Sequence, residues 1–117
     1  MAPVGNEALL AQLRRGTLQF CVLALLDREP AYAFDLVRSL GEVDGLVTSE
    51  GTIYPLLSRL RRDGLVSTTW RESSAGPPRR YYALTADGAR ALSDFRDDWT
   101  RFRDGVDSLL LSEGTPR

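Results

Sequence analysis

SEGTIYPLLSRLRRDGLV (49–66) runs directly into STTWRESSAGPPRRYYALTADG (67–88), and together they join a basic helix to a basic hairpin. Residues 49–83 hold six arginines and three acidic residues, whereas the segments before and after are net acidic. A helix fits the major groove of DNA, and a hairpin beside it reaches the flanking backbone. The stretch therefore predicts a DNA-reading surface, which the overall net charge of −1 conceals.

Helix signals set the limits of the first part of this stretch. Ser49 is the predicted N-cap and Gly64 the stop, with Pro55 expected close to the first turn. Val66, Thr68 and Trp70 then alternate as one face of a strand, and Tyr82 and Leu84 face the core from its partner. ESSAGPPR (72–79) is the expected hairpin tip. The inner face of the helix is expected to consist of apolar residues at helical spacing, namely Ile53, Leu56, Leu57 and Leu60.

The remaining segments are predicted to be helical. One helix is expected from Glu7 to about Asp27, interrupted at Gly16 at a cost of about 1 kcal/mol. Pro30 is expected to open a second helix that ends near Gly41. Thr85 is the predicted N-cap of a last helix that runs to about Ser112. The apolar stripe expected on the second helix comprises Tyr32, Leu36, Val37 and Leu40.

The last helix carries a second apolar pattern with the spacing of a coiled-coil seam. This seam consists of Leu92, Phe95, Trp99, Phe102, Val106 and Leu109. Two interpretations remain open, because the stripe could pack on its own domain or form a homodimer. The seam is too short to hold a dimer alone, and docking on the very apolar first helix of a second copy would cover both surfaces.

Composition excludes several classes of function. The chain has no histidine and one cysteine, Cys21, inside the apolar run FCVLALL (20–26), so we expect a buried thiol, no metal, no cofactor and no enzyme activity. No apolar run is long enough to predict a membrane span. The absence of a signal pattern and the single cysteine favour a cytoplasmic protein. At 117 residues, one compact core with an appendage is expected.

The chain resembles the PadR family of bacterial transcriptional regulators, in the short form with a single C-terminal dimerisation helix. EGTIYPLLSRLRRDGLV (50–66) is similar to the recognition helix of that family, and PPRRYYALTADG (77–88) to its wing and the start of its dimer helix. Ala31 and Tyr32 stand where the family usually has His-Gly-Tyr. The resemblance implies a mainly α fold with a small β-hairpin wing. A winged helix-turn-helix domain is expected over residues 1–84, and a C-terminal dimerisation helix with its tail over 85–117.

Candidate DNA contacts come from both parts of the basic stretch. In the helix, Arg59 has the geometry to read guanine, and hydroxyl and apolar groups near the helix start meet bases. In the hairpin, Arg79 and Arg80 follow two prolines and are expected to bind phosphates. For Arg61 a solvated helix face is an equal alternative, and for Tyr81 simple cover of the sheet. The predicted DNA-binding residues are Ser49, Thr52, Tyr54, Pro55, Ser58, Arg59, Arg62, Arg79, Arg80 and Tyr81.

Trp99 is the candidate effector residue, together with Phe95. Two Trp99 rings near a two-fold axis would leave a flat apolar slot for a planar aromatic molecule. The alternative is that Trp99 only fills the dimer core. The resemblance favours this slot, because small multidrug-responsive members of the family use aromatic residues of the C-terminal helix.

The leading functional hypothesis is a homodimeric, sequence-specific regulator of double-stranded DNA with an inverted-repeat operator. It is expected to repress its own or adjacent genes until a small aromatic ligand binds. The alternative is a winged-helix module that binds another protein through the same surface, without DNA or ligand. The arginines of residues 59–62 count against that alternative.

Overall fold

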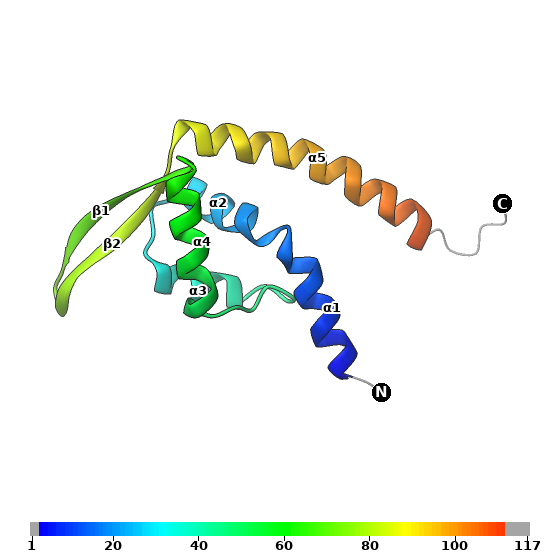
Figure 1. Ribbon diagram of the computed structural model, residues 1–117, viewed down its shortest axis with the longest axis horizontal. Helices are drawn as coiled ribbons and strands as arrows, with labels where there is room; N and C mark the ends of the chain where they lie inside the picture. Colours follow the sequence, from blue (N-terminus) through cyan, green and yellow to red (C-terminus); the bar gives the residue numbers. More distant parts are fainter. Residues whose placement is uncertain (1–2, 112–117) are drawn as a thin grey trace.

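The computed structural model describes residues 3–111 of the chain and shows a mainly helical fold with one antiparallel hairpin, as expected (Figure 1). The hairpin projects from one end, and the last helix extends toward the opposite end of an elongated molecule of 60 × 35 × 21 Å. The elements in chain order are α1 (Pro3–Arg15), α2 (Leu18–Arg28), α3 (Ala33–Gly41), α4 (Glu50–Arg62), β1 (Val66–Ser73), β2 (Gly76–Leu84) and α5 (Ala86–Leu110).

The single helix predicted from Glu7 to Asp27 is wrong, because the chain forms two helices, α1 and α2, that meet at 62°. The break lies at Gly16 and Thr17. The Thr17 amide donates to the Arg14 carbonyl at 3.0 Å, and the Thr17 hydroxyl donates to the Leu13 carbonyl at 3.2 Å. These bonds satisfy the last carbonyls of α1 and end it, so the glycine divides two helices instead of weakening one. No single helix within residues 3–111 combines the length and apolar character of a membrane span, although the bent pair α1 and α2 reaches both when taken together.

One hydrophobic core holds α2, α3, α4 and the base of the hairpin together. The predicted inner face of α4 is confirmed, since all four of its apolar residues are buried. Cys21 packs against this core, and burial raises the pKa of its thiol. The largest fully buried side chains are Val22, Leu23, Leu36, Leu40, Ile53, Leu57 and Leu60.

Pro30 does not open the second helix, contrary to the sequence prediction. Ala31 is extended and exchanges two backbone hydrogen bonds with Tyr82, at 3.1 and 2.8 Å, so α3 begins only at Ala33. Tyr32 is consequently the N-cap and packs beside the hairpin, outside the apolar stripe of α3. The end at Gly41 is confirmed. This bridge adds a third extended segment beside β2 and fixes the hairpin to the α2–α3 connection.

The hairpin is longer than predicted, and only Ser74 and Ala75 lie between the strands at its tip. Val66 pairs with Leu84, Thr68 with Tyr82 and Trp70 with Arg80. A register irregularity between Arg71 and Ser73 faces the two prolines of β2. Since proline is tolerated in strands at edges and bulges, the segment that sequence alone assigned to a loop continues the ladder.

The N-terminal half of α5 packs on the body of the protein. Thr85 is its N-cap, as predicted, and its hydroxyl accepts from the Gly88 amide at 3.0 Å. A Cβ at Gly88 would lie 2.1 Å from the Leu65 carbonyl oxygen, so only glycine permits this approach. Phe95 stacks on Phe20 of α2 with ring centroids 3.9 Å apart. Beyond this stack α5 extends away from the body and ends at Leu110 (Figure 1), and the predicted end at Ser112 lies outside the described residues.

Candidate nucleic-acid interface

Helix α4 exposes a polar face opposite its buried one. With 3.6 residues per turn, Pro55, Ser58 and Arg62 lie opposite Ile53 and Leu57, and all three are exposed. The flanks of this face differ, since Tyr54 lies toward the hairpin and Arg59 toward α1. The predicted contact residues within α4 therefore lie on this exposed face or on its flanks, and we call the face the α4 ridge.

The start of α4 agrees with the prediction in position but not in every detail. Ser49 is the N-cap residue, yet its side chain makes no capping bond to the backbone; its hydroxyl lies 3.4 Å from that of Thr52. Pro55 was expected close to the first turn, and it lies in the second turn because the helix begins at Glu50. Because proline has no backbone N–H, Pro55 cannot donate a hydrogen bond to the Gly51 carbonyl. Both residues are exposed on the same side of α4.

Strand alternation separates the two arginines that were predicted to act together. Arg79 and Arg80 lie on opposite faces of the hairpin, and each is held over a different aromatic ring. The Arg79 guanidinium lies 4.6 Å from the Tyr32 ring centre and donates to the Tyr32 hydroxyl. The Arg80 guanidinium lies 4.9 Å from the ring centre of Trp70. Such contacts restrict a long side chain while leaving most of its N–H donors available.

Tyr81 is half-buried and belongs to the same face as Arg79. Its ring meets Tyr32 edge-on at 5.2 Å, and the Arg71 guanidinium lies 4.3 Å from its centre. The interpretation of Tyr81 as cover for the sheet therefore describes its packing in this structure. The same packing holds Arg71 and Arg79 next to each other across the strand pair.

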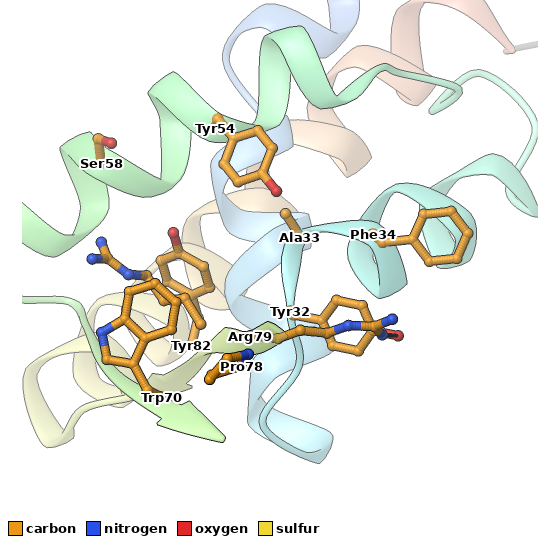
Figure 2. A pocket seen from close by; sticks show the side chains of 10 residues that line it. Tyr32, Ala33, Phe34, Tyr54, Ser58, Trp70, Pro78, Arg79 and Tyr82 are labelled. Carbon is orange, nitrogen blue, oxygen red and sulfur yellow. Dashed lines mark hydrogen bonds between the residues drawn. The ribbon is translucent and has the colours of Figure 1, made fainter. Parts of the chain in front are cut away.

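A groove of about 700 Å³ lies between α4 and the hairpin, and we call it the wing groove (Figure 2). Aromatic rings and guanidinium groups form its walls, and no carboxylate lines it among the described residues. Trp70, 64 % exposed, and Tyr54, 50 % exposed, face it from β1 and α4. Its main lining residues are Tyr32, Tyr54, Ser58, Trp70, Arg79 and Arg80.

A second groove, of about 640 Å³, lies on the opposite flank of α4 against the end of α1, and we call it the N-terminal groove. It also lacks a carboxylate among the described residues. Two of its arginines belong to the predicted α4 set, whereas the other two come from α1 and were not predicted. The polar residues that define it are Arg14, Arg15, Thr48, Thr52, Arg59 and Arg62.

The arginines around α4 and on the hairpin lack ionic partners in the described part of the chain. The ion pairs found there join Arg38 to Asp35 and Arg96 to Asp27. Three more lie within α5, namely Arg90 with Asp87, Arg101 with Asp98 and Arg103 with Asp104. An exposed cation without a carboxylate nearby keeps its full attraction for an external anion. The ridge of α4 with its two grooves is thus a cationic surface of the size and shape that a nucleic-acid backbone requires.

The model of the transcriptional regulator PadR-like family matches residues 22–94, a span from α2 to the first half of α5 that contains the ridge and the hairpin. The chain belongs to the PadR-like family. It is accordingly a DNA-binding transcription regulator and not an enzyme, and the winged-helix arrangement predicted from its sequence is confirmed. At the departures, Ala31 pairs with Tyr82 and Tyr32 is the N-cap residue of α3, so the helix is retained.

Solved structures of PadR-type regulators share this architecture over almost the whole chain. One from Eggerthella lenta is 40% identical, covers 92% of each chain and superposes with a TM-score of 0.79. One from Bacillus cereus is 35% identical, covers 89% of this chain and 99% of that chain, and has the same TM-score of 0.79. An uncharacterized protein of Lysinibacillus sphaericus is 24% identical over 102 residues, which is 86% of this chain and 92% of that protein.

Five of the groove residues named above were not predicted as site residues, namely Tyr32, Trp70, Arg14, Arg15 and Thr48. Tyr32 was placed in a helix stripe, and its contact with the hairpin depends on a backbone bridge between distant segments. Arg14 and Arg15 stood in a segment predicted to continue as one helix to about Asp27. The signal that could have found them is the basic pair directly before Gly16, at what proves to be the exposed end of α1.

Proposed function

We propose that this PadR-like protein binds an inverted-repeat operator as a homodimer, represses its own or an adjacent gene and is released by a planar aromatic molecule. The observation that carries the DNA part is the ridge of α4 between two grooves that contain arginine and no described carboxylate. The family supplies the regulatory role, and the exposed apolar half of α5 supports the dimer.

The proposal divides the DNA contacts into two kinds. Ser58, Arg59 and Arg62 on the exposed side of α4 meet base edges in the major groove, helped by Thr52, Tyr54 and Pro55 near the helix start. Ser49, at the N-cap, contacts the backbone. Arg79 binds phosphate on one face of the hairpin and Arg80 on the other, while Tyr81 positions Arg79 through Tyr32. Phosphate contacts set the orientation of the protein, and base contacts set its specificity.

The homodimer is proposed to form through the outer part of α5. Phe102 is 65 % exposed and Leu109 81 % exposed, which is unusual for apolar residues spaced along one face of a helix. Leu92 has to be removed from the predicted seam, because it is 2 % exposed and packs within the protomer core. Phe95 already stacks on Phe20, so the partner contacts its outer edge at most. Leu9 and Leu13 of α1 are also exposed and offer an apolar surface to the α5 of a second copy.

Trp99 is the proposed centre of the effector site. Its ring lies 6.0 Å from that of Phe95 and 6.2 Å from that of Phe102, so three aromatic rings follow one another along α5. A planar molecule stacks favourably on such a surface. Asp94, Asp97 and Asp98 are exposed beside it and favour a neutral or cationic ligand. Release of DNA requires that the ligand prefer a dimer whose two recognition helices are wrongly spaced for the operator.

A mobility-shift titration tests the proposed function. The probe is the duplex upstream of the protein's own gene, compared with a scrambled duplex of equal length at about 50 mM and about 200 mM salt. We expect a discrete complex with the upstream duplex that survives an excess of scrambled competitor and weakens steeply with salt. Equal binding of both duplexes would contradict sequence-specific regulation, and absence of any complex would favour the protein-binding alternative.

A further inference from the structure

The two grooves beside α4 are arranged as the two sides of a DNA major groove would require. An α-helix with its side chains is about 10–12 Å wide, and the major groove is about 12 Å wide between its two backbones. A helix seated there therefore has a phosphate strand on each flank. On the hairpin flank, the wing groove supplies Arg79 and Arg80. On the other flank, the N-terminal groove supplies Arg14 and Arg15 from α1.

The end of α1 is held in place beside α4. The Arg14 guanidinium donates to the Gly45 carbonyl at 2.9 Å, which ties α1 to the α3–α4 connection (Figure 1). Gly45 adopts φ +86, a conformation that favours glycine, so this connection has a defined shape at the contact. Arg15 follows on the last turn of α1 and is exposed. The position of the α1 arginines thus depends on the same connection that leads into α4.

Charge favours a phosphate strand over other occupants of this groove. Carbonyl groups at the end of a helix carry partial negative charge, so the attraction for an anion must come from the side chains. Arg14 and Arg15 supply two guanidinium groups on the α1 side of this groove, beside Arg59 and Arg62, which are proposed to reach base edges, and none of the four has an ion pair to a described carboxylate. Two cations at the end of α1, next to the helix that enters the major groove, match the phosphate strand on that flank.

We propose that Arg14 and Arg15 bind the phosphate strand on the α1 flank of α4, so that each half-site is held between α1 and the hairpin. Arg15 makes the contact with its whole guanidinium. Arg14 uses one nitrogen to fix α1 to Gly45 and directs its remaining donors to the strand. The inference rests on the proposed DNA binding and extends the interface to α1, which was not among the predicted DNA-binding segments.

Arg15→Ala is the variant that tests this inference, because Arg15 makes no hydrogen bond to another described residue that its loss would break. Arg15→Lys keeps the charge, and Arg101→Ala removes an equal charge from α5, where Arg101 pairs with Asp98 at 2.7 Å. Fluorescence anisotropy measures the affinity of each protein for the upstream duplex and for a scrambled duplex across a salt series. Light scattering and thermal melting establish that all variants share the mass and stability of the wild type.

We expect Arg15→Ala to lose affinity for both duplexes by the same factor and to lower the slope of log affinity against log salt by about two units, one for each subunit of the proposed dimer. Its deficit should therefore shrink by roughly one order of magnitude between about 50 mM and about 200 mM salt. Arg15→Lys should keep the wild-type slope, and Arg101→Ala should match the wild type throughout.

Several results would overturn the inference. A wild-type slope in Arg15→Ala, or a change that affects only one of the two duplexes, excludes a phosphate contact by Arg15 while leaving the proposed function intact. An Arg15→Lys variant as weak as Arg15→Ala excludes an electrostatic role. If the wild type binds neither duplex, the proposed function itself is wrong, and the inference about Arg14 and Arg15 is wrong as well.

Discussion

Helix α4 and the outer half of α5 each expose side chains that lack partners within the protomer, but of opposite chemical kinds. In α4 every apolar residue of the inner face is buried to at least nine-tenths, while its arginines have no ion pairs among the described residues. In α5 the charges are paired locally, as in Arg101 with Asp98 and Arg103 with Asp104, while Phe102 and Leu109 remain exposed. One surface therefore lacks anions and the other lacks apolar partners. From this difference we propose that DNA binds to α4 and that a second copy of the chain packs on α5.

The largest expected effect comes from charging the exposed side of α5. Phe102→Asp places a carboxylate in the proposed apolar interface, which costs several kcal/mol when unpaired. Because Phe102 is 65 % exposed in the protomer, the variant should stay folded but have the mass of one chain by light scattering. Its affinity for the operator should fall by orders of magnitude, since two half-sites are no longer bound by linked subunits.

Phe102→Leu is the matched control and should remain a dimer. A Phe102→Asp protein that keeps the mass of two chains would show that the dimer, if present, uses another surface. Leu92→Asp should instead unfold the protomer, because Leu92 lies in its core.

A smaller effect is expected on the α4 ridge. Arg59→Ala should reduce affinity for the operator by about 1–3 kcal/mol if the side chain reads a base, and discrimination against altered base pairs should relax at that position. Competition titrations with operators that carry single base-pair changes measure this. Arg62→Ala serves for comparison on the same face, and an unchanged base preference in both variants would restrict α4 to backbone contacts.

The aromatic series on α5 should respond to ligand with a change of about 1 kcal/mol or more for loss of one stacking partner. Planar cationic dyes are expected to quench tryptophan fluorescence in the wild type, and Trp99→Ala should bind them more weakly. Because Trp70 also emits, the titrations use a Trp70→Phe background. If dye affinity is the same with and without Trp99, Trp99 does not bind the ligand and only packs in the dimer interface.

The smallest effect should separate the two faces of the hairpin. Arg79→Ala and Arg80→Ala should each lower the salt slope by about one unit per subunit, or about two units for the dimer, without changing base preference. Arg79→Ala also removes the contact with Tyr32, which Tyr32→Phe tests by deleting only the hydroxyl that Arg79 bonds. If Tyr32→Phe has the wild-type salt slope and affinity, this hydrogen bond does not position Arg79 for DNA.

Local signals were sufficient to predict α4, the N-cap Thr85 and the apolar face of the recognition helix from sequence. Contacts between distant segments were not. The bridge between Ala31 and Tyr82 moves the start of α3 to Ala33, and the spacing of apolar residues in either segment does not indicate it. Heptad spacing identified an apolar seam on α5 but not which surface each residue meets, so Leu92 and Phe95 turned out to pack on their own protomer.

Within the candidate site, the residue types were predictable and their grouping was not. Six arginines between residues 49 and 83 indicated an anion-binding surface. The opposite orientation of Arg79 and Arg80 follows from strand alternation, because β2 begins at Gly76 and includes both arginines, whereas the sequence prediction placed Arg79 in the hairpin tip. The place of Arg14 and Arg15 beside α4 depends on the bend at Gly16 and Thr17, which the helix pattern across residues 7–27 concealed.

The mass of the complex with a duplex that carries one inverted repeat tests the division between the two surfaces most directly. Sedimentation equilibrium with labelled duplex, at protein concentrations well above the dissociation constant, measures how many chains bind each DNA. We expect two chains per duplex for the wild type, and we expect Phe102→Asp not to form this complex under the same conditions. One wild-type chain per duplex, or two chains that Phe102→Asp still assembles, would contradict the assignment of α4 to DNA and α5 to the second copy.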